Sequence, residues 1–116
     1  MREISEERLK RFWEWCGLTY KTSRSTEYWY GPKGESIVSA LGNGGRVLFT
    51  LGNLVKYAVP KCQLRGEIVS LIALEHSGFE CCIAYFVEPE PRIEVRDGDP
   101  AIAVFLAIEK LIEEVQ

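Results

Sequence analysis

The 116-residue sequence has little of what enzymatic, metal-binding or membrane functions usually require. It contains a single histidine, His76, and no CxxC pair. Its apolar runs, such as residues 81–87, are far shorter than the roughly 20 residues that a membrane helix needs. The first ten residues are charged and lack the apolar stretch of a signal peptide. We therefore expect a cytoplasmic protein with no membrane segment, no bound metal and no cofactor.

Secretory disulfides are also not expected. The chain is long enough to bury a core without covalent cross-links. Two of the four cysteines, Cys81 and Cys82, are adjacent and would point to opposite faces of a strand. We expect all four thiols to be reduced, with Cys81 and Cys82 buried on opposite sides of a central strand.

Helical spacing of apolar residues marks three segments. Ser5, followed by two glutamates, is typical of a helix N-cap, and Gly17 is typical of the residue that follows a helix. Asp99 before Pro100 is a second N-cap signal, ahead of a long apolar stripe. Pro60 is expected to disturb or end the middle helix. The spacing predicts helices near residues 5–16, 51–62 and 99–115.

The remaining segments have the composition of strands and turns. LTY, EYWY, SIVSAL and RVLFT are short β-type runs separated by GPKG and GNGG, which predicts an antiparallel meander. In GPKG, proline in the second position favours a type I turn over a phosphate loop. EIVSLIALE and FECCIAYFV, joined by HSG, are apolar at both alternating sets of positions, which predicts a hairpin covered on both faces. The acidic segment 88–99 is expected to be a loop with a short edge strand at RIEV.

Helices at both ends and in the middle of a β-rich chain favour layers on both faces of a sheet. We predict an α+β fold, a three-layer α/β/α sandwich with a mainly antiparallel sheet, formed by one domain over residues 1–116.

The order of several motifs resembles a known family. FWEWCGL followed by YWYGPKGE, then FTLGNLVKYAVPK, and GDPAIAVFLAIEKL at the end are similar to the phage ABA sandwich domain, a small α/β protein of phages and prophages. The resemblance implies a three-layer fold and an accessory role in the cytoplasm of a bacterial host. It implies no catalytic residue.

The charges are unevenly distributed along the chain. Residues 8–65 hold ten basic and three acidic residues, whereas residues 66–116 hold three basic and eleven acidic ones. Such asymmetry is compatible with an anion-binding face, a contact between chains, or compensation within the fold. The segment with the most aromatic residues lies in the basic part, and stacking rings with nearby cations suit a nucleotide or a single strand. The candidate ligand-binding residues are Lys21, Arg24, Tyr28, Trp29, Tyr30 and Lys33.

Two functional hypotheses follow, and neither is enzymatic, because no nucleophile, base and orienting group fall together. The first is a non-catalytic phage-type accessory domain that binds a host or phage protein, or a small ligand. The alternative is binding or sequestration of an anionic nucleotide or single-stranded nucleic acid by the central segment. Binding to duplex DNA is not expected, because no helix is rich in base-reading residues and the net charge is −3.

Overall fold

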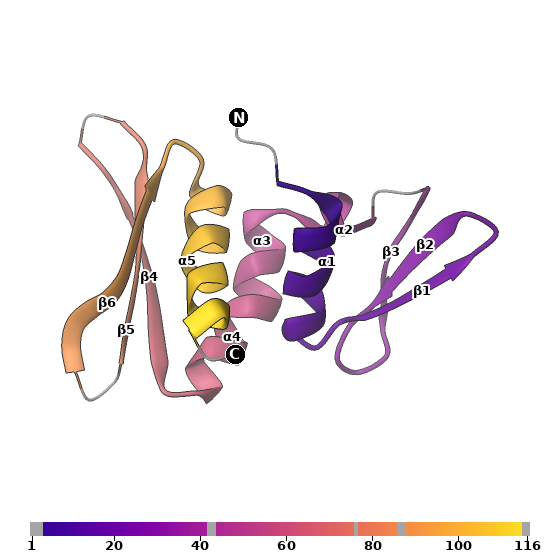
Figure 1. Ribbon diagram of the computed structural model, residues 1–116, viewed down its shortest axis with the longest axis horizontal. Coiled ribbons are helices and arrows are strands. Elements are labelled where there is room, and N and C mark those ends of the chain that lie inside the picture. The colour runs from indigo at the N-terminus through magenta and orange to yellow at the C-terminus, as the bar shows by residue number, and fades with distance from the viewer. Residues whose placement is uncertain (1–3, 42–43, 76, 86–87, 115–116) are drawn as a thin grey trace. The chain divides into compact units, whose positions relative to one another are not determined.

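The computed structural model describes residues 4–41, 44–75, 77–85 and 88–114, and it confirms an α+β protein with antiparallel sheets. The strands are divided between two three-stranded sheets, whereas one sheet was expected (Figure 1). Each sheet belongs to one of two compact units, Met1–Asn53 and Leu54–Gln116, which we describe separately. That the whole chain forms a single domain stays a prediction.

The first unit begins with helix α1, Glu6–Trp15, at the position expected from the sequence. The Ser5 hydroxyl oxygen accepts the backbone N–H of Arg8 at 3.2 Å, which confirms the N-cap. Gly17, with a φ of 93°, follows the helix and provides the left-handed conformation that favours glycine. The buried face of α1 carries Leu9, Phe12 and Trp13.

Strands β1 (Thr19–Ser23), β2 (Thr26–Tyr30) and β3 (Ser36–Leu41) form the predicted meander in the order β1-β2-β3. The GPKG segment is the expected turn, because the Gly34 N–H donates to the Gly31 carbonyl at 2.9 Å. This segment is therefore a hairpin turn and not a phosphate loop.

The RVLFT segment was predicted to be a fourth strand, and this prediction was wrong. Most of it lies in the short helix α2, Gly44–Leu48. A carboxylate oxygen of Glu6 accepts the Arg46 backbone N–H at 3.1 Å, and the Trp13 indole donates to the Gly45 carbonyl at 3.0 Å. These contacts with α1 satisfy backbone groups that a strand would pair with a neighbouring strand. Tertiary contacts thus override the β-type composition.

The helix expected near residues 51–62 is confirmed, in three consecutive segments. They are α3 (Leu51–Asn53), the π-helical η1 (Leu54–Ala58) and α4 (Val59–Leu64). Pro60 lies in the first turn of α4, where its missing N–H is tolerated. The wider π-helical turn directly before it is a common accommodation of such a disturbance.

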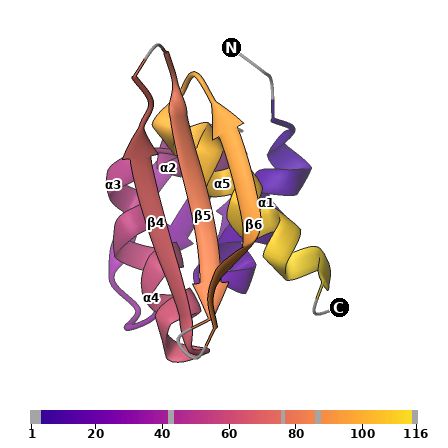
Figure 2. The same cartoon turned by 90° about the vertical axis from the view of Figure 1, so that its left-hand side faces the viewer.

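The second unit contains the antiparallel sheet β4 (Glu67–Ala73), β5 (Phe79–Tyr85) and β6 (Glu88–Asp97), with β5 in the centre. Helix α5, Pro100–Glu114, lies along one face of this sheet (Figure 2). The Asp99 side chain accepts the N–H groups of Ala101 at 2.8 Å and of Ile102 at 3.3 Å, so Asp99 is the predicted N-cap. Against the sheet, α5 buries an apolar stripe that includes Phe105, Ile108 and Leu111.

All four cysteines are buried thiols, and Cys81 and Cys82 alternate between the two faces of the central strand, as predicted. The expected cover on both faces of the hairpin is not found for β4. Ile68 is 44% and Ile72 is 50% exposed, on the face opposite α5. The acidic segment also differs from the expectation, because β6 is a ten-residue edge strand and not a loop with a short strand.

Candidate functional site

The predicted ligand-binding residues lie in the first unit, on both faces and at both ends of its sheet. Lys21 pairs with Tyr28 across β1 and β2, and Tyr30 lies two residues further along the same face. The Lys21 ammonium lies 5.5 Å from the centre of the Tyr30 ring. Three of the six residues, Lys21, Tyr28 and Tyr30, therefore share one face, which we call the Lys21 face.

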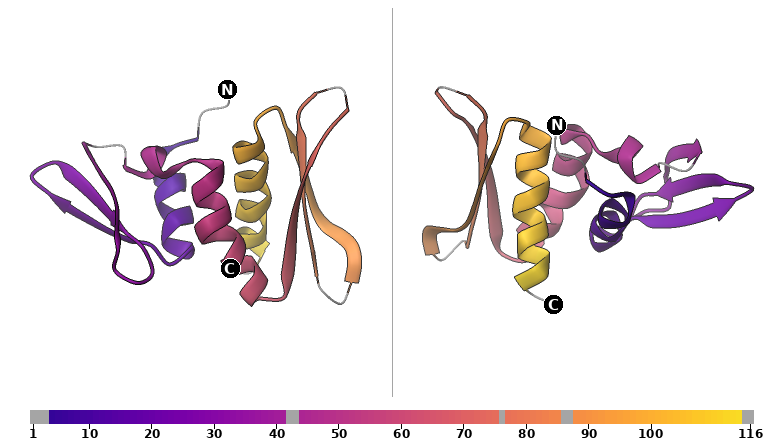
Figure 3. Two further views of the ribbon diagram at one scale, coloured as in Figure 1. Left: turned by 180° about the vertical axis from the view of Figure 1, so that it is seen from behind. Right: turned by 45° about the horizontal axis from the view of Figure 1, so that its top comes forward.

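Arg24 and Lys33 lie in the turns at opposite ends of β2. The Arg24–Ser25 turn joins β1 to β2 and has φ values of 51° and 68°. Lys33 belongs to the turn between β2 and β3, where its N–H donates to a Glu35 carboxylate oxygen at 2.9 Å. The five residues of β2 span about 17 Å. Figure 3 shows the two turns well apart, so one ligand of nucleotide size does not reach both.

Trp29 lies on the opposite face from Lys21 and is part of the core. It is 1% exposed, and its ring centre lies 5.1 Å from that of Tyr20. Among the described residues, no group accepts a hydrogen bond from its indole N–H. Burying a donor without an acceptor is costly, and native proteins rarely leave one unpaired. This N–H is therefore a sign of a missing acceptor.

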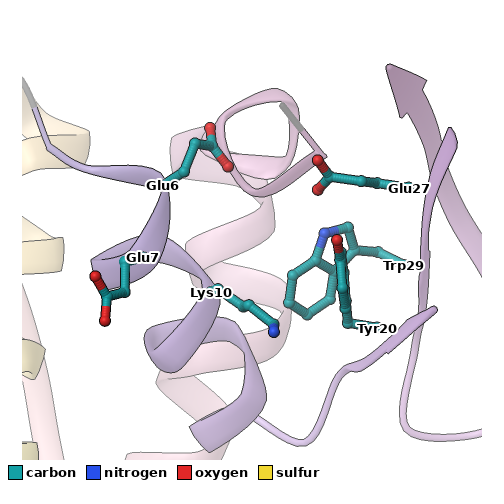
Figure 4. Close-up of a pocket in the computed structure, with 6 residues that line it drawn as sticks. All are labelled: Glu6, Glu7, Lys10, Tyr20, Glu27 and Trp29. Carbon is teal, nitrogen blue, oxygen red and sulfur yellow. The ribbon is translucent and has the colours of Figure 1, made fainter. Parts of the chain in front are cut away.

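A pocket of about 210 Å³ lies beside Trp29. Helix α1 contributes three of its lining residues, and strands β1 and β2 contribute the other three (Figure 4). We call it the Trp29 pocket, and it is lined by Glu6, Glu7, Lys10, Tyr20, Glu27 and Trp29. In the view of Figure 4, the indole nitrogen lies at the end of the ring that is closer to the Glu27 carboxylate.

The polar groups of the pocket are unequally compensated. Glu6 is held by Arg46, whose Nε lies 3.6 Å from a Glu6 carboxylate oxygen and whose backbone N–H donates to the same group. The Lys10 ammonium lies 4.6 Å from the centre of the Tyr20 ring. Burial, and then the neighbouring Glu27 carboxylate, raise the pKa of the Tyr20 hydroxyl. The pocket thus offers acceptors from Glu7 and Glu27, and the Trp29 ring in its wall carries a buried, unpaired N–H.

Sequence reasoning singled out Trp29 and missed the other five residues of the Trp29 pocket. One signal was available for part of it, because Glu6 and Lys10 are four residues apart and therefore share a helix face. Tyr20 and Glu27 carry no such signal. They reach the pocket only because the β1–β2 register places them on the same face as Trp29.

A second polar group lies on the exposed face of the other sheet. The ligand atoms of Glu80, Cys82 and Glu94 lie within 4.8 Å of one another. Arg96 already pairs with Glu80, at 2.6 Å between Nε and a carboxylate oxygen, and the Cys82 thiol contacts the other oxygen at 3.5 Å. These contacts lower the pKa of Glu80, with the Arg96 hydrogen bond as the main cause. The group is explained as an ion pair with a neighbouring thiol.

The thiols are poor candidates for nucleophiles. Burial raises the pKa of Cys62 to about 12 and that of Cys81 to about 12, and it also raises the pKa of Cys82. A thiol with such a pKa holds very little thiolate at neutral pH. His76, the one histidine of the sequence, lies outside the described residues.

No protein-family model, curated protein or solved structure matches this chain. The resemblance to the phage ABA sandwich domain therefore stays a prediction. Among the helices of the described residues, none combines the length and the apolar character that crossing a membrane requires.

Proposed function

We propose that this protein is a non-catalytic accessory domain of phage or prophage type that acts in the bacterial cytoplasm by binding a small ligand in the Trp29 pocket. The observation that carries the proposal is the Trp29 side chain, which lines a pocket and whose buried indole N–H has no hydrogen-bond partner among the described residues. A bound ligand with an acceptor atom would remove the cost of this unpaired donor. The high pKa values of the buried thiols support a binding role over a covalent one.

The test is a ligand screen on the full chain with the three tryptophan indole N–H signals resolved by NMR. We expect a subset of small polar molecules to shift the Trp29 signal and to leave that of Trp13 in place, because Trp13 already donates to Gly45. If several hundred chemically diverse small molecules at millimolar concentration leave the Trp29 signal unchanged, the proposal is wrong.

The alternative function, binding of an anionic nucleotide or single-stranded nucleic acid, is supported by the Lys21 face. There an ammonium lies beside the Tyr30 ring, and Tyr28 lies on the same face. Stacking and cations are the contacts that a single strand uses. Titration with nucleotides and oligonucleotides at low salt tests it, with Lys21→Ala and Tyr30→Ala as variants. Binding that persists in both variants would contradict this placement.

A further inference from the structure

We infer that the Trp29 pocket binds a protonated organic amine that also carries an acceptor oxygen, and that the Lys10 ammonium takes the place of this amine when the ligand is absent. This inference rests on the proposed function and names its ligand class. Three features of the pocket support it: the carboxylates, the Tyr20 ring with the Lys10 ammonium beside it, and the unpaired indole donor of Trp29.

The carboxylates make the pocket selective for positive charge. Three glutamates and one lysine line it, and Arg46 compensates only Glu6. Glu7 and Glu27 remain to attract a cation, with the Tyr20 hydroxyl already hydrogen-bonded to Glu27, and an amine offers both carboxylates charge-assisted hydrogen bonds. A ligand whose only charge is negative would meet two carboxylates and a single ammonium, that of Lys10.

The Lys10 side chain shows that the pocket accepts an ammonium. Its Nζ lies 4.6 Å from the centre of the Tyr20 ring, within the range of a cation–π contact. Lys10 is exposed and its side chain is long and flexible, so its contact with the ring is weak and can be exchanged for that of a ligand. Figure 4 shows the Lys10 side chain extending from α1 toward the Tyr20 ring.

The indole donor adds a second requirement. An amine alone satisfies the carboxylates and leaves the Trp29 N–H unpaired, because a protonated amine has no acceptor. The pocket is therefore complementary to an ammonium with an oxygen acceptor a few bonds away. A free amino alcohol offers this chemistry, and so does the amino-terminal residue of a peptide, whose carbonyl oxygen is close to its ammonium.

The experiment follows the Trp29 indole N–H signal of the full chain, assigned through contacts to the Tyr20 ring, at neutral pH and low salt. The probes are ethanolamine, glycylglycine amide, ethylamine and acetate. Ethanolamine or the dipeptide amide should move the indole proton downfield, as expected for a new hydrogen bond. Ethylamine should perturb the Tyr20 ring without that shift, and acetate should do neither. A stronger response to ethanolamine than to glycylglycine amide indicates that the ligand is a free amino alcohol. The reverse order indicates the amino terminus of a peptide.

Two variants and a control test the roles of the charges. Glu27→Gln should weaken binding of the responding amine by about tenfold, because a charge-assisted hydrogen bond becomes a neutral one. Lys10→Ala should tighten binding several-fold, because it removes both a competitor and a positive charge. Glu113→Gln, on an exposed position of α5 in the other unit, should leave the affinity unchanged.

The inference is overturned if acetate produces the downfield shift, if Lys10→Ala weakens amine binding, or if neither wild type nor Lys10→Ala responds to any of the three amines. Should the broader screen still find a ligand that moves the Trp29 signal, only the ligand class is wrong. Should that screen find none, the proposed function fails as well.

Discussion

At the scale of single residues, Trp29 packs the edge of its indole against Gly44. A Cβ added at Gly44 would lie 2.8 Å from Cδ1 and 2.9 Å from Nε1 of the ring. Both distances are too short for real contacts, and the ring is buried, so it cannot move away freely. The missing side chain of Gly44 is therefore a requirement of the Trp29 pocket.

We predict that Gly44→Ala lowers the free energy of unfolding by about 1 to 3 kcal/mol, through overpacking against Trp29. A loss of stability would be informative, because alanine in place of glycine normally stabilises a helix and would raise the free energy of unfolding. Urea denaturation measures the effect. Gly98→Ala is the control, since nothing lies within 4 Å of its added Cβ, and it should be close to neutral. A stable Gly44→Ala variant would mean that the indole is not held against α2.

Glu67 is a buried acidic residue whose surroundings do not compensate its charge. It is 1% exposed, and no described group makes a hydrogen bond to either carboxylate oxygen, although Arg65 Nε lies 3.4 Å from one of them. Burial raises the pKa of Glu67, and the attraction of Arg65 opposes this effect only in part.

A raised pKa predicts a specific pH dependence of stability. The folded state holds the Glu67 proton at pH values where the unfolded chain has lost it, so the contribution of Glu67 is largest below the ordinary glutamate pKa. It falls as the pH rises through the raised folded value. We predict that Glu67→Gln removes this fall. At pH 7 its free energy of unfolding should exceed that of wild type by about 1 kcal/mol. Denaturation at several pH values checks it, with Glu113→Gln as the control. A destabilised Glu67→Gln at pH 7 would show that the pair with Arg65 is net favourable.

At the scale of elements, α5 and the hairpins show how local signals and packing combine. The buried stripe of α5 includes Phe105, which is completely inaccessible. We predict that Phe105→Ala costs about 3 to 5 kcal/mol, from lost burial and the cavity left behind. A urea melt measures this loss, and Lys110→Ala, on the exposed side of α5, is the matched control. A loss below about 1 kcal/mol would contradict the packing of α5 on its sheet.

The β1–β2 turn stores backbone strain, because Arg24 and Ser25 both have positive φ values. Such a two-residue turn favours Asn-Gly. We predict that the double variant Arg24→Asn, Ser25→Gly raises the free energy of unfolding by about 0.5 to 1 kcal/mol. Equal stabilities of wild type and double variant would contradict the assigned turn geometry.

The β2–β3 turn offers the opposite case. Gly34→Ala should lower the free energy of unfolding, because Gly34 has a φ of 81° and open space around it, so that only backbone strain is added.

The elements that sequence reasoning predicted correctly are those with local causes. Ser5 and Asp99 cap helices through their own side chains, and the GPKG turn follows from the positions of its proline and glycines. The wrong predictions depend on distant contacts. RVLFT forms α2 because α1 supplies its hydrogen-bond partners. Ile68 is exposed although its strand is apolar at both alternating sets of positions, because local apolar patterns do not reveal which element covers a strand. The Trp29 pocket was missed for the same reason, since strand register assembles it.

At the scale of the whole molecule, the two units contain different natural probes. All three tryptophans lie in the first unit, whereas Cys62, Cys81 and Cys82 lie in the second. The predicted single domain requires both probes to report one transition. We predict that tryptophan fluorescence and labelling of Cys62, Cys81 and Cys82 give coincident unfolding curves in urea, with all four thiols, including Cys16 of the first unit, reduced and unreactive in the folded protein. Two separated transitions would instead show two domains.

A crystal structure of the full chain soaked with the amine that gives the strongest NMR response tests ligand binding in the Trp29 pocket most directly. We predict density for the ligand in this pocket, with its ammonium beside Tyr20 and Glu27, its oxygen within hydrogen-bonding distance of the Trp29 indole nitrogen, and the Lys10 side chain displaced from the Tyr20 ring. Ligand density elsewhere on the protein, with Lys10 still over Tyr20, would contradict it.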